Sequence, residues 1–120
     1  MSFKNVPTYS YQRIFDIVWK GAKKQNFRKS ENFARCMYRS NARTRCHIGH
    51  LIDDSEYRTS LEGRSAQEVA ELLGVGLSSQ KRAFLSLLQY HCHDKCKDAS
   101  EIKRQLKAFA KNRGLTIPKG

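Results

Sequence analysis

Apolar side chains recur at helical spacing in four stretches of the chain. In the first stretch, Ile14 and Val18 share one face of a predicted helix, and Ser10 is in the position of its N-cap. In the second stretch, Ser65 and Glu68 have the spacing of a capping box, in which each side chain accepts a hydrogen bond from the other residue's amide. The predicted helices cover residues 10–24, 65–73, about 78–93 and about 98–113, the third beginning at Ser78 or Ser79 and the fourth capped by Asp98 or Ser100.

Two short strands are predicted between the first helix and the second. Residues 34–39 and 44–49 contain strand-favouring side chains, and residues 40–43, which read Ser-Asn-Ala-Arg, favour a turn between them. A two-stranded hairpin alone is marginally stable in water, so we expect it to pack on the helices. The predicted fold class is α+β and mostly α, with about four helices packed against a small two-stranded β-hairpin.

The length and composition fit one globular domain. Of the 120 residues, 39% are hydrophobic, which is enough for one core and excludes a collagen-like or fully disordered chain. We expect a single domain over residues 1–120, with short flexible ends at about 1–8 and 115–120. No apolar run approaches the roughly 18 residues of a spanning helix, and the first residues lack the apolar region of a secretory signal. We therefore expect a soluble, intracellular protein with no membrane partner.

The formal net charge of +12 is not distributed evenly along the chain. Residues 20–45 hold nine basic residues and one acidic residue, and residues 81–120 hold ten basic residues and three acidic ones. Between these two basic blocks, residues 46–80 hold six acidic residues and two basic ones. Segregated positive charge is typical of proteins that bind nucleic acid, although surface helices often carry excess lysine without any ligand.

The first basic block contains the candidate binding residues. Arginine suits phosphate because its guanidinium group donates two hydrogen bonds in one plane. Tyr38 and Phe27 lie among these charges and could stack on exposed bases, while the alternative interpretation is a solvated basic face with Tyr38 in the core. The candidate nucleic-acid or partner-binding residues are Lys20, Lys23, Lys24, Arg28, Lys29, Arg35, Tyr38, Arg39, Arg43 and Arg45.

All cysteines and histidines fall into two groups. Those on or beside the predicted hairpin are Cys36, Cys46, His47 and His50, and those near the end of the third predicted helix are His91, Cys92, His93 and Cys96. Thiolates and imidazoles supplied by two short segments are the usual ligands of a structural zinc ion. The spacing singles out no set of four, and buried thiols with ordinary histidines are the alternative interpretation. A structural zinc ion is therefore the one cofactor that the sequence suggests.

A catalytic function could rest on the same histidines, or on a divalent ion held by Asp53 and Asp54, whose alternative interpretation is an N-cap pair of a short helix. The histidines could act as acid–base groups on a phosphodiester, with an arginine of the first basic block steadying the phosphate. Neither a glycine-rich phosphate loop nor a nucleophile elbow is present in the sequence. We therefore assign no catalytic residue.

The segment from Cys36 to Gly63 carries a pattern of its own. It reads C-M-Y-R from Cys36 and R-C-H-I-G-H-L-I-D-D from Arg45, followed by a tyrosine and by L-E-G. This pattern resembles a family of small phage and prophage proteins of unassigned function, in which C-x-Y-R is followed by C-A-I-G-C-L-I-x-D. The similarity extends from about Ile14 to Leu115, including an L-Q…H-D stretch, and its motifs are specific only in the middle.

Two positions depart from the pattern of that family. His50 stands where the family has Cys, and His47 stands where it has Ala. Because an exchange of Cys for His keeps a zinc ligand but loses a disulfide partner, the resemblance favours one set of metal ligands. That set is Cys36, Cys46, His50 and His93. The resemblance also implies a phage origin and the cytoplasm of the bacterial host, and it implies no activity.

Three functions remain in competition. The first is a small basic phage accessory protein, not an enzyme, that binds nucleic acid or a nucleic-acid-bearing host assembly through the first basic block. The second is a protein-binding inhibitor of a host or anti-phage defence enzyme, with the basic face matched to an acidic host protein. The third is a small histidine-dependent nuclease. We predict the first, because the charge is segregated along the chain and no spacing defines a catalytic geometry.

Overall fold

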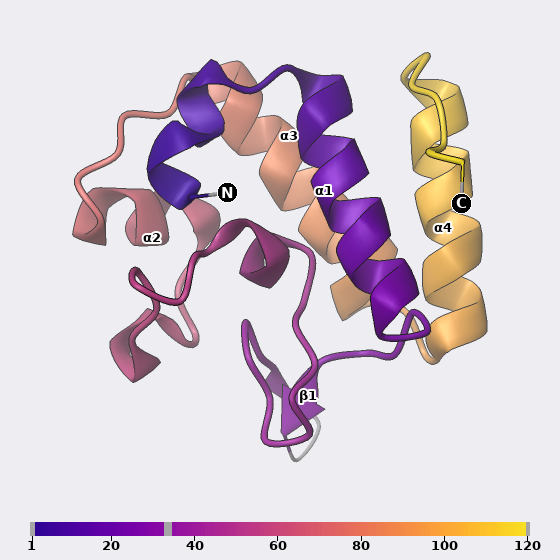
Figure 1. Ribbon diagram of the computed structural model, residues 1–120, viewed down its shortest axis with the longest axis horizontal. Helices are drawn as coiled ribbons and strands as arrows, with labels where there is room; N and C mark the ends of the chain where they lie inside the picture. The colour runs from indigo at the N-terminus through magenta and orange to yellow at the C-terminus, as the bar shows by residue number, and fades with distance from the viewer. Residues whose placement is uncertain (1, 33–34, 120) are drawn as a thin grey trace.

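Helices account for most of the fold (Figure 1). The computed structural model describes residues 2–32 and 35–119. Within these ranges the fold is α+β and mostly α, as predicted, and no helix is both long enough and apolar enough to cross a membrane. The α-helices are α1 (Tyr11–Lys24), α2 (Ala66–Leu72), α3 (Ser79–Gln89) and α4 (Ala99–Asn112). Phe3–Thr8, Ile48–Leu51 and Thr59–Leu61 are 3₁₀-helices, and Tyr90–Asp94 is a π-helix.

The helices begin at the predicted caps. The side chain of Ser10 accepts a hydrogen bond from an amide in the first turn of α1, and Ser65 and Glu68 form the predicted capping box of α2. Ser78 and Asp98 cap α3 and α4 in the same way. These bonds satisfy amides that the start of a helix leaves free, so local polar residues determine where each helix begins.

Three of the helices meet around one aromatic ring. Phe84 of α3 stacks on Tyr11 of α1 with ring centroids 4.6 Å apart, and it meets Phe109 of α4 edge to face at 5.3 Å. Figure 1 shows α3 passing behind α1. The fully buried Leu85 and Leu88 extend this contact along α3. Burial of this aromatic and aliphatic surface joins the helices into one core.

The hairpin lies earlier in the chain than predicted. β1 (Glu31–Asn32) pairs antiparallel with β2 (Arg35–Cys36). The predicted strand over residues 34–39 is confirmed only at Arg35 and Cys36, and the prediction of its partner over residues 44–49 is wrong; residue 34 itself lies outside the described residues. Among the residues that the structure describes, these two segments share a single antiparallel bridge, which joins Arg39 to Arg45.

Side-chain hydrogen bonds explain why the predicted strand pairing does not extend beyond β2. The amides of Tyr38 and Arg39 donate to the carboxylate of Glu62 at 2.8 and 3.1 Å. The amide of Ile48 donates to the side-chain oxygen of Gln89 at 2.8 Å. Because these amides are already paired, they cannot serve a strand ladder, and tertiary contacts override the strand propensity of the segment.

The first described residues pack into the core, and the segment after α4 is bonded to α1 at the surface. We expected a flexible end over residues 1–8, but Phe3–Thr8 form a 3₁₀-helix in which Phe3 and Val6 are completely buried. At the other end, the amide of Thr116 donates to the side-chain oxygen of Gln12 at 2.9 Å. This bond ties the segment after α4 to the start of α1.

Candidate nucleic-acid interface

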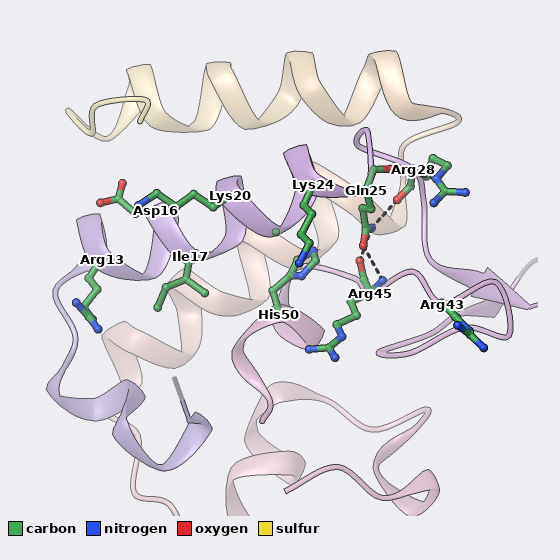
Figure 2. Close-up of a pocket in the computed structure, with 11 residues that line it drawn as sticks. Arg13, Asp16, Ile17, Lys20, Lys24, Gln25, Arg28, Arg43, Arg45 and His50 are labelled. Atoms are coloured by element: carbon green, nitrogen blue, oxygen red, sulfur yellow. Dashed lines mark hydrogen bonds between the residues drawn. The ribbon is translucent and has the colours of Figure 1, made fainter. Parts of the chain in front are cut away.

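A hollow of about 810 Å³ lies between α1 and the segment that carries Arg43, Arg45 and His50 (Figure 2). Six arginine and lysine side chains line it, together with one acidic side chain, that of Asp16. We call this hollow the basic groove. Its lining residues are Arg13, Asp16, Ile17, Lys20, Gly21, Lys24, Gln25, Arg28, Arg43, Arg45 and His50.

The period of α1 builds one wall of the basic groove. Arg13, Lys20 and Lys24 lie at positions i, i+7 and i+11, so they share one side of the helix. Ile14 and Val18 lie on another side and are completely buried. Figure 2 shows the three basic side chains spaced along α1. The wall spans eleven residue steps, or roughly 16 Å at the rise of an α-helix.

Gln25 joins this wall to the opposite one. Its side-chain amide donates to the carbonyl oxygen of Arg45 at 2.8 Å, and its side-chain oxygen accepts from the amide of Arg45 at 3.0 Å. The same side-chain nitrogen donates to the carbonyl oxygen of Arg28 at 2.9 Å, as Figure 2 shows. These bonds fix the end of α1 relative to the opposite segment, so the width of the groove is set by the fold.

His50 forms the floor of the basic groove. Its ring packs against Gly21, where an added Cβ would lie 2.4 Å from Nδ1. Glycine normally weakens a helix, and this close approach explains its presence here. Burial and the charge of Arg45 lower the pKa of His50 to about 3. The imidazole is therefore neutral at physiological pH, and its buried Nε2 has no hydrogen-bond partner among the described residues.

Most cations of the groove have no acidic partner. Among the residues that the structure describes, no ion pair involves any groove cation except Arg45. Arg45 lies 3.1 Å from the carboxylate of Asp54, whose side chain is 80% exposed, and surface pairs of this kind contribute little to stability. Uncompensated positive charge in a concave surface attracts anions from solution.

The structure divides the ten predicted binding residues into two sets. Lys20, Lys24, Arg28, Arg43 and Arg45 line the basic groove, whereas Lys23, Lys29, Arg35, Tyr38 and Arg39 lie outside it. Arg13 also lines the groove but was not predicted, although its helical spacing from Lys20 was an available signal. Gln25 was not predicted either, because its partners lie on another segment and leave no local signal.

Two basic residues outside the groove are held by contacts within the fold. Arg39 lies 2.9 Å from the carboxylate of Asp54, and its guanidinium group lies over the ring of Tyr57. Lys29 donates to the carbonyl oxygen of Asp94 at 3.1 Å. Neither side chain is directed into the groove.

Tyr38 and Phe27 are not available to stack on bases. Their exposed fractions are 7% and 9%. The hydroxyl of Tyr38 donates to the carbonyl oxygen of Arg64, and the ring of Phe27 packs edge to face on Trp19. The alternative interpretation, with Tyr38 in the core, agrees with the structure.

Cys36, His93 and Asp94 form a group that could hold a metal ion. Their ligand atoms all lie within 4.8 Å of one another. Cys36 and His93 of the predicted set are therefore together, whereas Cys46 and His50 belong to no such group in the described part of the chain. The ring of His50 is turned to α1 instead, and Cys46 is buried in the core.

Hydrogen bonds occupy both ring nitrogens of His93. Its Nε2 accepts from the amide of Ser30 at 3.0 Å, so the proton is on Nδ1, which donates to Asp94 at 3.0 Å. Burial and the neighbouring Asp94 raise the pKa of Cys36 to about 11, which keeps the thiol protonated. A metal ion would have to displace both protons. The group offers three donors, one fewer than a structural zinc ion takes.

Two of the four histidines that could act as acid–base groups lie in the core. His47 and His93 are each 1% exposed, and their rings meet edge to face with centroids 5.3 Å apart. His47 Nε2 bonds to the carbonyl oxygen of Cys92 at 2.8 Å. A phosphodiester cannot reach these buried nitrogens. Of the other two histidines, His50 lines the basic groove, and His91 is exposed outside it.

Comparison with known proteins assigns no family. No protein-family model matches the chain, and neither curated proteins nor solved structures give a match. The chemistry of the basic groove is therefore the basis for a functional assignment.

Proposed function

We propose that this protein binds nucleic acid, or a nucleic-acid-bearing host assembly, through the basic groove and catalyses no reaction. The observation that supports this function is the convergence of six arginine and lysine side chains on one concave surface with a single acidic residue. Lysine and arginine on a phosphate backbone release condensed counterions, and this release supplies essentially all of non-specific affinity for nucleic acid.

The dimensions of the groove favour a polymer over a single anion. The wall formed by α1 extends for roughly 16 Å, and about five phosphates of one duplex strand occupy that length along the helix axis. A lone phosphate would contact only part of this wall. Arg43 and Arg45 face the wall from the opposite segment, so a backbone lying in the groove would have cations on both sides.

A pair of charge reversals tests whether the groove is the binding site. Lys20→Glu with Lys24→Glu changes two exposed groove lysines at i and i+4, the second in the last turn of α1. The matched control is Lys107→Glu with Lys111→Glu, which changes two exposed lysines at the same spacing, the second in the last turn of α4. Both double variants have the same net charge.

Fluorescence anisotropy with labelled oligonucleotides gives the readout. At about 100 mM salt, the groove variant should bind about 10- to 100-fold more weakly than the unaltered protein, and the α4 variant should stay within about threefold. Equal losses in the two variants would mean that bulk charge drives binding, and a larger loss in the α4 variant would move the site to α4. Either result overturns the assignment of the groove.

The dependence of binding on salt is a second measurement. If all six cations of the groove contact phosphates, the logarithm of the binding constant for a duplex should fall by about 5 for each tenfold rise in salt. A flat response between low and physiological salt would contradict nucleic-acid binding. Capture of an acidic host protein from a nuclease-treated lysate, without binding to any oligonucleotide, would favour the inhibitor function instead.

For a zinc ion we propose the Cys36, His93 and Asp94 group as the site. The closeness of the three donors supports this location, and water would take the fourth position, which is the arrangement of an open zinc site and not of a closed structural one. Purified protein should then contain one zinc ion per chain, which Cys36→Ser should remove. Cys92→Ser changes a buried cysteine outside the group and should leave the zinc content unchanged. Metal-free protein from zinc-supplemented medium would refute this site.

A further inference from the structure

We infer that the basic groove recognises the phosphate backbone of a paired nucleic-acid duplex in preference to an unpaired strand, an inference that rests on the proposed function. Two observations carry it. Among the described residues, the lining offers no aromatic ring to unpaired bases, and its two walls are joined by hydrogen bonds that hold the backbone of Arg45 opposite the end of α1.

The lining of the groove, in the part of the chain that the structure describes, contains no Phe, Tyr or Trp. Its ring-bearing residue is His50, whose ring packs against Gly21. Proteins that bind unpaired strands without sequence preference combine a basic groove with aromatic side chains on which successive bases stack. A duplex needs no such surface, because its bases are already stacked on one another.

In the ranges that the structure describes, the exposed aromatic residues lie elsewhere. Tyr11 and Tyr90 have exposed fractions of 40% and 56%, and neither lines the groove. Tyr11 also stacks on Phe84 in the core, with ring centroids 4.6 Å apart. A strand following the groove would therefore place its phosphates on cations while its bases had no aromatic partner.

The fixed walls favour a regular backbone. Gln25 bonds to both the amide and the carbonyl oxygen of Arg45, which holds that arginine's backbone opposite the end of α1. A duplex is stiff over lengths far greater than this groove, so its phosphates arrive already spaced. An unpaired strand would lose conformational freedom when it was held against the same cations. This loss of conformational entropy by the unpaired strand favours binding of the duplex even where both make the same number of ion contacts.

Recognition of the backbone also predicts that affinity depends little on the nucleotide sequence of the duplex. Phosphate contacts fix the position of a protein on a duplex but carry no sequence information. DNA and RNA duplexes share the charged backbone and differ in helix shape and in the 2′-hydroxyl group. The proposed ligand is therefore the phosphate backbone of a duplex. Separate DNA and RNA probes distinguish which kind of duplex supplies it.

Anisotropy titrations of the full chain test the inference. The probes are a labelled DNA duplex of about 20 base pairs, one of its strands chosen to avoid self-pairing, and the RNA counterparts of both. At about 100 mM salt we expect at least one duplex to bind about tenfold more tightly than its own strand. Comparison of the two duplexes then identifies the preferred source.

Three other results have distinct meanings. If each strand binds as tightly as its duplex, or more tightly, this inference is overturned and the proposed function stands. If none of the four probes binds, the proposed function itself is overturned, and the inference falls with it. If two DNA duplexes of unrelated sequence differ by more than about tenfold in affinity, backbone recognition is insufficient and the inference is again overturned.

The groove variant links the preference to the site. Lys20→Glu with Lys24→Glu should weaken duplex binding about 10- to 100-fold and reduce the preference for duplex over strand. Lys107→Glu with Lys111→Glu should preserve both. A duplex preference that survives the groove variant unchanged would place duplex recognition on another surface and contradict the inference.

Discussion

The imidazole ring of His50 packs directly against the backbone of Gly21 near the end of α1. A Cβ at residue 21 would lie 2.4 Å from Nδ1 and 2.6 Å from Cγ of that ring. The contact seats the 3₁₀-helix Ile48–Leu51 on α1 and forms the floor of the basic groove. The two helices can approach this closely only because residue 21 has no side chain.

Gly21→Ala should destabilise the protein. In an unconstrained helix this change stabilises by about 1 kcal/mol, but here the new methyl group overlaps the His50 ring. We expect a loss of about 1–3 kcal/mol in the free energy of unfolding, typical of overpacking. Urea unfolding followed by the fluorescence of the buried Trp19 measures it.

His50→Ala provides the control for this contact. It removes the ring that the added methyl group would strike, so the two substitutions together should destabilise by less than the sum of their separate effects. Strict additivity, or a gain in stability from Gly21→Ala alone, would contradict the packing of His50 on Gly21.

Stability should decrease as the pH falls below about 6.5, the usual pKa of histidine. Burial lowers the pKa of His47, with a smaller effect from His93, and burial and Arg45 lower the pKa of His50 to about 3. Below this pH the histidines of the unfolded chain bind protons, whereas His47 and His50 of the folded chain stay neutral. The stability that these two residues contribute is therefore fully present above about pH 6.5 and is lost as the pH falls below it. The loss for each buried histidine is roughly 1 kcal/mol per pH unit.

Urea titrations between about pH 7.5 and 5.5 measure this slope. His50→Asn should reduce this dependence of stability on pH, because it removes one of the two histidines whose pKa is lowered. His91→Asn makes the same substitution at an exposed histidine and serves as the matched control. A stability that is constant across the interval would show that these imidazoles are not buried in neutral form.

Glu56 joins the start of the chain to a distant turn. One carboxylate oxygen accepts from the amides of Phe3 and Asp53 at 2.8 and 2.9 Å. The other accepts from the hydroxyl of Ser2 at 2.7 Å and the amide of Lys4 at 3.1 Å. Burial raises the pKa of Glu56, but these hydrogen bonds outweigh it and leave the pKa below its usual value.

Glu56→Gln should cost about 2 kcal/mol of stability, because one acceptor oxygen is replaced by a donor that faces other donors. Glu71→Gln removes the same charge from an exposed position of α2 and should cost less than about 0.5 kcal/mol. The difference between the two variants should shrink as the pH falls through the pKa of folded Glu56, where its carboxylate is protonated. Equal effects at neutral pH would contradict the role of Glu56.

Tyr38→Phe should weaken the fold without changing nucleic-acid binding. The hydroxyl of Tyr38 is paired with the carbonyl oxygen of Arg64, and burial raises its pKa above the usual range. Loss of this buried hydrogen bond should cost about 1–2 kcal/mol, measured by urea unfolding. Under conditions where both are folded, the variant and the unaltered protein should bind nucleic acid equally. A marked loss of affinity would mean that Tyr38 contacts the nucleic acid.

The helices could be predicted because their signals are local. Ser10 caps α1, and Ser65 with Glu68 caps α2, through bonds between residues three positions apart. The apolar stripe of each helix likewise follows from its 3.6-residue period. The segregation of charge was also visible, and half of the predicted binding residues do line the basic groove.

The remaining features depend on contacts between segments far apart in the chain. Glu62 takes the amides of Tyr38 and Arg39 and so keeps the predicted strand from extending beyond β2, although strand propensity favoured it. Gln25 and Arg45 are twenty positions apart, yet their hydrogen bonds set the width of the groove. Periodicity and composition describe residues within a few turns of one another, so they cannot indicate which distant amide a side chain will satisfy.

The amino-acid sequence by itself therefore established a basic, mostly helical chain with its helix starts in place. The folded arrangement determined which cations share a hollow, which aromatic rings are withdrawn into the core, and which cysteine meets a histidine. The physical reason is that burial and hydrogen-bond pairing are properties of the whole fold, whereas capping and helical period are properties of adjacent residues.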